Sequence, residues 1–136
     1  MKLTALGFRR CARFHTLLVD GLPRFAPATR SAAYRLVALV DAAYDAKTRL
    51  VCSAAAAKPE ALFERILPRA AFDAALAAAS PAEAELLVSD DTLAFVKERT
   101  SSRLTEMQSV EWARAHAEAR APELLASLPP DDKHVV

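Results

Sequence analysis

The sequence predicts an α/β fold that is mostly helical, in which a βαβ unit with two parallel strands is followed by further helices. Two short apolar runs, 14–19 and 48–54, flank a segment whose apolar residues recur at helical spacing. A crossover of this length between the two runs makes their strands parallel. Because parallel strands need neighbours on both edges, two strands alone make a poor sheet. The pattern therefore indicates more sheet elsewhere.

The first strand and the helix after it have clear local signals. Asp20-Gly21 follows the first apolar run, so we expect a buried strand over 14–19 that ends in a turn. Pro27 and Thr29 then introduce the helix. Its apolar residues lie on one helical stripe: Ala33, Leu36, Val37, Val40, Ala43 and Tyr44. This face should pack against the core.

Between Pro59 and about Arg120 the sequence predicts further helices. Pro59 fits the first turn of a helix that runs through Leu67, and an alanine-rich helix is expected over 70–79. Ser80 and Glu83 form a capping box around Pro81 at the next helix start. A single long helix is expected from about Ser102 to Arg120, packed through Leu104, Met107 and Trp112.

Length, composition and charge limit the classes of function. A chain of 136 residues is one domain or part of one, and 53% hydrophobic residues are enough for a packed core. The net charge is +1, from 18 basic and 17 acidic residues, so nothing favours binding to nucleic acid. No apolar run reaches the roughly 18 residues that span a bilayer, so we expect no transmembrane segment.

The residues of a nucleotide-binding loop are missing from the sequence. A P-loop has the form GxxxxGK[ST], and the two glycines, Gly7 and Gly21, lie too far apart to build one. The run LLVDG, which ends at Asp20 and Gly21, resembles a Walker B strand whose acid serves Mg²⁺. Glycine follows instead of the glutamate that would polarise water, so an ordinary Asp-Gly turn is the favoured interpretation.

Other catalytic chemistry has weaker support in the sequence. Cys52 lies in an apolar run and is predicted to be a buried structural thiol. No histidine is spaced with a cysteine or an acid in the way a metal site requires, so no metal is expected. A small enzyme that uses Cys52 or Asp20 is therefore the least favoured hypothesis.

Arg99 and Arg103 are the best functional candidates. They are four residues apart at a predicted helix start, so both can lie on one face. Two guanidinium groups in this position can bind a phosphate or a partner's carboxylate. From spacing alone, a pair of exposed arginines, or one arginine bonded to Glu106, is the simpler interpretation.

Two stretches resemble the C-terminal third of the Afg/ZapE-type AAA+ ATPases. The first family pattern, RRFxxLIDxLYDxxVxLxxSA, is matched here by Arg35, Leu39, Val40, Asp41, Tyr44, Asp45, Leu50, Ser53 and Ala54. The second, FxxxRTxSRLxEMxS, is matched without a gap by Phe95, Arg99, Thr100, Ser102, Arg103, Leu104, Glu106, Met107 and Ser109. The resemblance covers about Arg13 to Trp112 and implies a part of a larger P-loop NTPase-type protein.

The resemblance also implies a function for the parent protein. Family members bind and hydrolyse ATP with Mg²⁺, form homo-oligomers and act on protein clients, in mitochondrial inner-membrane quality control or in bacterial cell division. The chain would then be mitochondrial in a eukaryote and otherwise cytoplasmic and membrane-associated. The family's Walker A, Walker B, sensor and arginine finger lie upstream of the matched stretches. This chain would hold no catalytic residue and bind no cofactor alone, with Arg99 and Arg103 as nucleotide-sensing candidates.

These expectations divide the chain into three parts. Residues 1–12 are predicted to be a leftover N-terminal segment, with Met1 a truncated start. Residues 13–120 are the ATPase-like region, and residues 121–136 are predicted to be a flexible tail. The leading hypothesis is a C-terminal fragment of an Afg/ZapE-family ATPase. The alternative is a non-catalytic interaction module that binds a full-length relative by supplying strands to its sheet.

Overall fold

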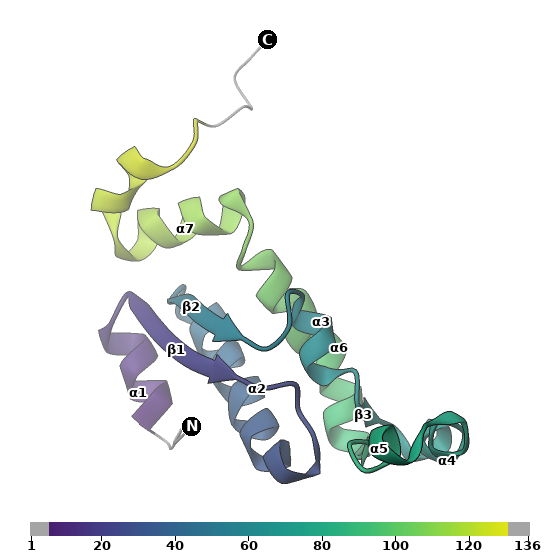
Figure 1. Ribbon diagram of the computed structural model, residues 1–136. Coiled ribbons are helices and arrows are strands. Elements are labelled where there is room, and N and C mark those ends of the chain that lie inside the picture. Colours follow the sequence, from purple (N-terminus) through teal and green to yellow (C-terminus); the bar gives the residue numbers. More distant parts are fainter. Residues whose placement is uncertain (1–5, 131–136) are drawn as a thin grey trace.

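The computed structural model describes residues 6–130 (Figure 1). This part of the chain has four strands and seven α-helices. A short 3₁₀ helix, η1 (Pro27–Thr29), precedes α2, and another, η2 (Pro122–Ser127), follows α7. The first elements are α1 (Leu6–Arg13), β1 (Thr16–Leu22), α2 (Arg30–Asp45), β2 (Arg49–Ala54) and α3 (Pro59–Phe63). They are followed by β3 (Ile66–Leu67), α4 (Arg69–Ala78), α5 (Pro81–Ala84), β4 (Val88–Ser89), α6 (Asp91–Glu106) and α7 (Val110–Arg120).

The βαβ unit is confirmed. Strands β1 and β2 pair in parallel, with Leu18 opposite Val51, and α2 is the crossover between them. Leu17 and Leu50, opposite each other in this ladder, pack against the buried residues of α2. All of the predicted stripe of α2 is buried except Tyr44, which is half-buried. The fold is therefore the mostly helical α/β arrangement that the sequence predicts.

The prediction of a buried strand over 14–19 that ends in a turn at Asp20-Gly21 is wrong. Strand β1 begins at Thr16, only Leu22 in it is buried, and it does not end at that turn. It continues to Leu22, and the register shifts between Val19 and Leu22. Gly21 has φ +74°, a conformation that side chains disfavour, and its N–H donates to Ser53 Oγ of β2 at 2.8 Å. Asp20 and Gly21 therefore form an irregularity inside the strand instead of a turn at its end.

The sequence indicated more sheet than β1 and β2 but did not predict strands at Ile66–Leu67 and Val88–Ser89. The helix expected from Pro59 to Leu67 ends at Phe63, and β3 then pairs in parallel with β4. Each of these strands has two residues, which is too short for any periodicity to show in the sequence. Within residues 6–130, β1 and β2 pair only with each other.

The single helix expected over 102–120 is two helices. Helix α6 ends at Glu106, and Ser109 starts α7 by accepting a hydrogen bond from the Trp112 N–H at 3.2 Å. The same serine hydroxyl donates to the carbonyl of Glu106 at 2.7 Å, so it satisfies backbone groups of both helices. Leu104 and Trp112 are buried, and Met107 packs against the core, as predicted.

The main core lies between α2, α3 and α6. Its largest buried side chains are Phe25, Leu36, Phe63, Ile66 and Leu93. Helices α4 and α5 contribute no buried residue and lie at the opposite end of the molecule from α7 (Figure 1). The capping box predicted for α5 is present, because Ser80 Oγ accepts from the Glu83 N–H while the Glu83 carboxylate accepts from the Ser80 N–H. No helix within residues 6–130 is long and apolar enough to cross a membrane.

A buried carboxylate fixes the start of α6. Asp90 accepts hydrogen bonds from the Leu93 N–H at 2.9 Å, from Tyr34 Oη at 2.8 Å and from Arg30 Nε at 2.6 Å. Desolvation raises the pKa of Asp90, but these three donors outweigh it and the net pKa is lowered. A lowered pKa means that the folded state binds the Asp90 proton less tightly than the unfolded chain does.

The contribution of Asp90 to stability should therefore depend on pH. It is fully present above the ordinary carboxyl pKa of about 3.9 and is lost as pH falls through the lower folded-state pKa. Replacing Asp90 with asparagine should lower the free energy of unfolding by about 1–3 kcal/mol at neutral pH. Urea unfolding at neutral pH and near pH 3 measures the effect, which should shrink in acid. The exposed Asp73→Asn on α4 is the control and should change stability little at either pH.

Candidate functional site

The two family-like stretches meet where α2 contacts α6. Asp41 on α2 accepts hydrogen bonds from both arginines of α6, one on each carboxylate oxygen. Arg99 Nη2 lies 2.9 Å from Asp41 Oδ2, and Arg103 Nη1 lies 2.5 Å from Asp41 Oδ1. Hydrogen bonds between ionised groups are stronger than those between neutral ones. This double ion pair therefore joins segments that are about sixty residues apart in the sequence.

The position of the arginines differs in part from the prediction. They share one side of a helix, as their spacing predicts, but they lie in the second half of α6 and not at its start. Neither bonds to Glu106 within the described residues, since Asp41 takes both. Arg99 is half-exposed, whereas Arg103 is about three-quarters buried. Arg99 therefore keeps donor groups that face solvent.

Tyr44 and Glu106 extend the same network by one helical turn. Tyr44 Oη donates to Glu106 Oε2 at 2.9 Å, and the Arg103 guanidinium lies 4.7 Å from the centre of the Tyr44 ring. The hydrogen bond to Glu106, and then desolvation, raise the pKa of Tyr44, so the phenol stays protonated and keeps donating. Asp41, Tyr44, Arg99, Arg103 and Glu106 form what we call the α2–α6 network.

The other predicted site residues lie outside this network. Ser53 Oγ donates to Asp20 across β1 and β2, and it also accepts from Gly21. Ser102 is exposed on α6, and Met107 is partly buried against the core. Arg35 of α2 is half-buried, and its Nε has no hydrogen-bond partner within the described residues.

The prediction of a buried Cys52 is wrong. Cys52 is exposed in β2, whereas Cys11 of α1 is buried. The expectation of a buried Cys52 fails because β2 pairs only with β1 within the described residues, so the other edge of β2 is not covered by a neighbouring strand. Desolvation nevertheless raises the pKa of the Cys52 thiol, which disfavours the thiolate that a nucleophile needs. In the described part of the chain, no group of three or more His, Cys, Asp or Glu side chains is placed to hold a metal ion.

Arg120 is an important residue that the sequence analysis missed. Its Nη1 donates to the carbonyl of Ala46 at 2.7 Å and to that of Cys11 at 3.2 Å, and its Nη2 donates to the carbonyl of Ala12 at 3.3 Å. One side chain of α7 thus binds the C-terminal ends of both α1 and α2. A basic residue in the last turn of a helix is too common a feature to have indicated this role.

Comparison with known families agrees with the first of the two stretches. A family model described as AFG1-like ATPase matches residues 9–75. Residues 9–75 therefore resemble a segment of the AFG1-like ATPases. This segment includes α2 with Asp41 and Tyr44, and β2 with Ser53, whereas α6 lies beyond it. No solved structure matches the chain. Nucleotide use is a property of the AFG1-like ATPase family.

Proposed function

We propose that the chain is the C-terminal part of an AFG1-like ATPase that binds and hydrolyses ATP, and that the α2–α6 network senses the nucleotide. The observation that carries the proposal is the double ion pair of Asp41 with Arg99 and Arg103. The walls of the nucleotide site, the catalytic groups and the contacts to Mg²⁺ come from other parts of the ATPase. This chain supplies two guanidinium groups on one face of a helix.

The proposed sensing rests on competition for the arginines. Each guanidinium has five N–H donors, and Asp41 occupies one donor of each in the contacts above. A phosphate carries more charge and more acceptor oxygens than a carboxylate, so it competes with Asp41 for the same donors. Arg99, which is half-exposed, reaches an incoming phosphate first. Release of Asp41 then loosens the contact between α2 and α6.

The test uses the ATPase that carries this segment. It compares a variant that should weaken ATP binding with one that should tighten it. Arg103→Ala removes a phosphate donor and should weaken ATP binding about threefold to tenfold, whereas Asp41→Asn frees both arginines and should tighten it by a similar factor. Arg69→Ala, on the exposed part of α4, is the matched control and should change nothing. ATP affinity is measured by titration calorimetry and hydrolysis by phosphate release.

A purely structural role predicts a different pattern. In that case Asp41→Asn and Arg103→Ala destabilise the same helix contact. Both variants should then lower the free energy of unfolding, and neither should tighten ATP binding. Unchanged ATP affinity and unchanged hydrolysis in Arg103→Ala would show that nucleotide sensing is wrong.

The cellular setting follows the family and is part of the same proposal. The parent ATPase is a homo-oligomer that acts on protein clients, in mitochondrial inner-membrane quality control or in bacterial cell division. Its location is mitochondrial in a eukaryote and otherwise cytoplasmic and membrane-associated. Fractionation of cells that express the tagged protein tests the location, and recovery in the wrong fraction contradicts it.

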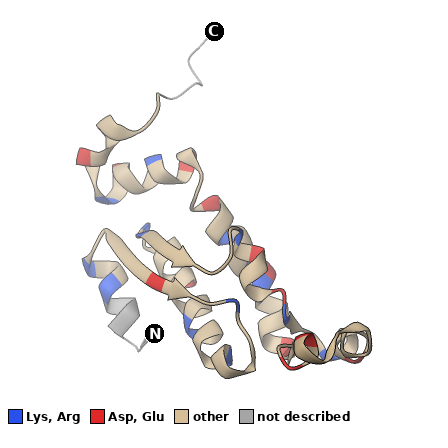
Figure 2. Ribbon diagram, in the orientation of Figure 1, with Lys and Arg blue, Asp and Glu red and all other residues tan. Residues whose placement is uncertain are grey.

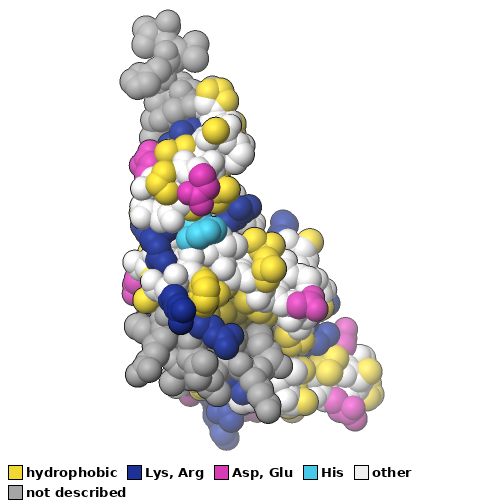
Figure 3. Space-filling view, turned by 90° about the vertical axis from the view of Figure 1, so that its left-hand side faces the viewer, with side chains coloured by type: hydrophobic (Ala, Val, Ile, Leu, Met, Phe, Trp, Pro, Cys, Tyr) yellow, Lys and Arg dark blue, Asp and Glu magenta, His cyan; other side chains and the backbone are white. Residues whose placement is uncertain are grey.

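A second candidate is a non-catalytic module that completes its sheet with a strand from a full-length relative. The exposed sheet face favours it, because Leu18 of β1 is 80% exposed and Val51, opposite it, is also exposed. Apolar side chains lie among basic ones on the face of the molecule that carries α1 and β1 (Figure 3). An open sheet edge beside exposed apolar residues is a common site for strand addition.

This candidate has its own test. Leu18→Glu should weaken binding to the full-length ATPase about tenfold or more, because a buried apolar contact would receive a charge. Leu86→Glu, an exposed leucine outside this sheet, is the control and should bind normally. If neither variant alters binding, the sheet face is not the docking site.

A further inference from the structure

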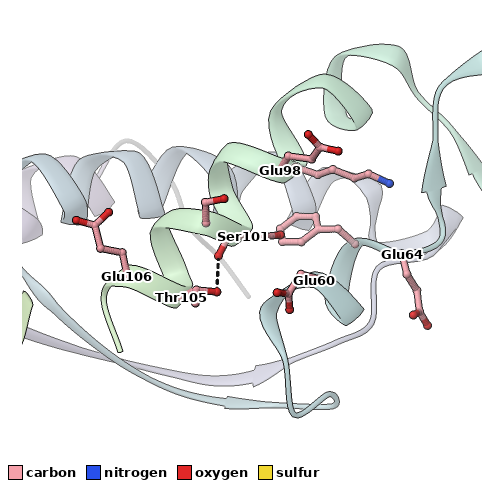
Figure 4. Close-up of a pocket in the computed structure, with 9 residues that line it drawn as sticks. Glu60, Glu64, Glu98, Ser101, Thr105 and Glu106 are labelled. Atoms are coloured by element: carbon pink, nitrogen blue, oxygen red, sulfur yellow. Dashed lines mark hydrogen bonds between the residues drawn. The ribbon is translucent and has the colours of Figure 1, made fainter. Parts of the chain in front are cut away.

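A groove of about 860 Å³ runs between α3 and α6 (Figure 4). Phe63 of α3 lines it, and four glutamates surround it. Glu60 and Glu64 come from α3, while Glu98 and Glu106 come from α6. In Figure 4, Glu106 and Glu64 lie at opposite ends and Glu60 lies between them. The acidic side chains are therefore spread along the groove and not gathered at one point.

The groove keeps uncompensated negative charge. Glu64 pairs with Arg24, and Glu106 accepts from Tyr44. Glu60 and Glu98 have no ion-pair or side-chain hydrogen-bond partner among the described residues. The lysine that lines the groove, Lys97, directs its ammonium to the carbonyl of Ile66 at 2.6 Å. Acidic and basic positions both occur along α6 (Figure 2), and its acidic residues Glu98 and Glu106 are among those that line the groove. The surface is thus complementary to a partner with positive charge.

A hydroxyl without a hydrogen-bond partner among the described residues is a second feature of the groove. Ser101 is only 7% exposed and lines the groove on the same helical stripe as Lys97 and Thr105. Its hydroxyl makes no hydrogen bond to any described residue, although its backbone carbonyl accepts from Thr105 Oγ1 at 2.9 Å. The donor and the acceptor of this hydroxyl are therefore free to bind a polar group that enters the groove.

We propose that the groove between α3 and α6 binds an arginine- or lysine-rich segment of a partner protein. The segment lies along α6, its cationic side chains pair with Glu60 and Glu98, and a polar group of the segment bonds to the Ser101 hydroxyl. Guanidinium groups suit this site because they bind carboxylates through two parallel hydrogen bonds. The spread of the glutamates favours an extended chain of cations over a single metal ion, which needs its ligands together. The groove is acidic and binds cationic side chains, whereas the proposed nucleotide-sensing arginines are positively charged and bind phosphate.

The test is fluorescence anisotropy of the whole chain with a labelled peptide of repeating Ala-Ala-Arg units, beside a peptide of the same length with Glu in place of Arg. The arginine peptide should bind and the glutamate peptide should not. The double variant Glu60→Gln/Glu98→Gln should weaken binding about fivefold to thirtyfold. Ser101→Ala should weaken it about twofold to tenfold. Glu85→Gln/Glu118→Gln, which changes two exposed glutamates outside the groove, removes the same charge and is the control.

The control separates a site from general attraction. If Glu85→Gln/Glu118→Gln weakens binding as much as Glu60→Gln/Glu98→Gln does, the peptide binds by overall charge and the proposed site is wrong. Lack of binding by the arginine peptide, or an unchanged affinity in Ser101→Ala, also overturns the proposal as stated. The exposed glutamates can be changed without loss of packing, and thermal unfolding followed by circular dichroism verifies that both double variants are folded.

Discussion

Replacing Phe63 with alanine should lower the free energy of unfolding by about 3–5 kcal/mol. Phe63 is fully buried at the end of α3, and its ring centre lies 5.1 Å from that of Phe25 with a tilt of 44°. It also joins the side chains of α2, α3 and α6 in one core. Alanine would leave a cavity that the surrounding helices cannot fill, so the lost contacts would not be recovered.

Urea unfolding followed by the fluorescence of the single tryptophan, Trp112, measures this effect. Phe95→Ala on α6 is the matched control, because Phe95 is 84% exposed and the same side chain is removed. This control should change stability by less than about 0.5 kcal/mol. Equal losses in the two variants would mean that Phe63 is not in the core.

Replacing Arg120 with alanine should cost about 2–4 kcal/mol, the second-largest effect we expect. Its guanidinium binds the carbonyls of Cys11, Ala12 and Ala46, which lie at the ends of two helices where no further helical N–H is available. The positive charge of the guanidinium is also attracted to the partial negative charge at those helix ends. Loss of the side chain removes this donor from the carbonyls of Ala12 and Ala46, whereas the carbonyl of Cys11 still accepts from Thr48 Oγ1 at 2.7 Å. It also removes the hydrogen bonds that tie α7 to the ends of α1 and α2.

Thiol reactivity gives a local readout of the Arg120 change. Cys52 is exposed and should react with a maleimide in every variant, whereas the buried Cys11 should react slowly in the unaltered chain. In Arg120→Ala, Cys11 should become labelled at least several-fold faster, because α1 is released. Arg120→Lys should restore part of the protection, since it keeps the charge but offers a single donor atom. Slow labelling of Cys11 in Arg120→Ala would contradict the proposed role.

Elements with long periodic patterns were predictable from the sequence. Helix α2 was found because its apolar residues recur with helical spacing over sixteen residues, and the two apolar runs beside it gave the parallel pair β1 and β2. The capping box of α5 was found because Ser80 and Glu83 interact locally. In each case the determinant lies within a few residues of the feature.

Features that depend on contacts distant in the sequence were not predictable in the same way. Strands β3 and β4 have two residues each and exist because they pair with each other. The break between α6 and α7 depends on which of several serines acts as a cap, and Ser109 gives no stronger local signal than Ser101 or Ser102.

The candidate site was predictable only in part. Spacing placed Arg99 and Arg103 on one face of a helix, but their partner Asp41 is about sixty residues away and only the packing of α2 on α6 brings it near. Arg120 is similar, because its acceptors are backbone carbonyls, which every residue carries. Neither its identity nor its spacing distinguishes it from other arginines.

The exposed position of α4 and α5 at one end of the molecule has a practical consequence. Neither helix contributes a buried side chain, and α4 lies at the end of the molecule away from α7, while the core beneath is built from α2, α3 and α6. A reporter domain inserted between Ala79 and Ser80 would therefore join two exposed surface elements and leave the α2–α6 network and the acidic groove in place. The joint between these two helices is thus the natural place to tag the protein for following it in living cells.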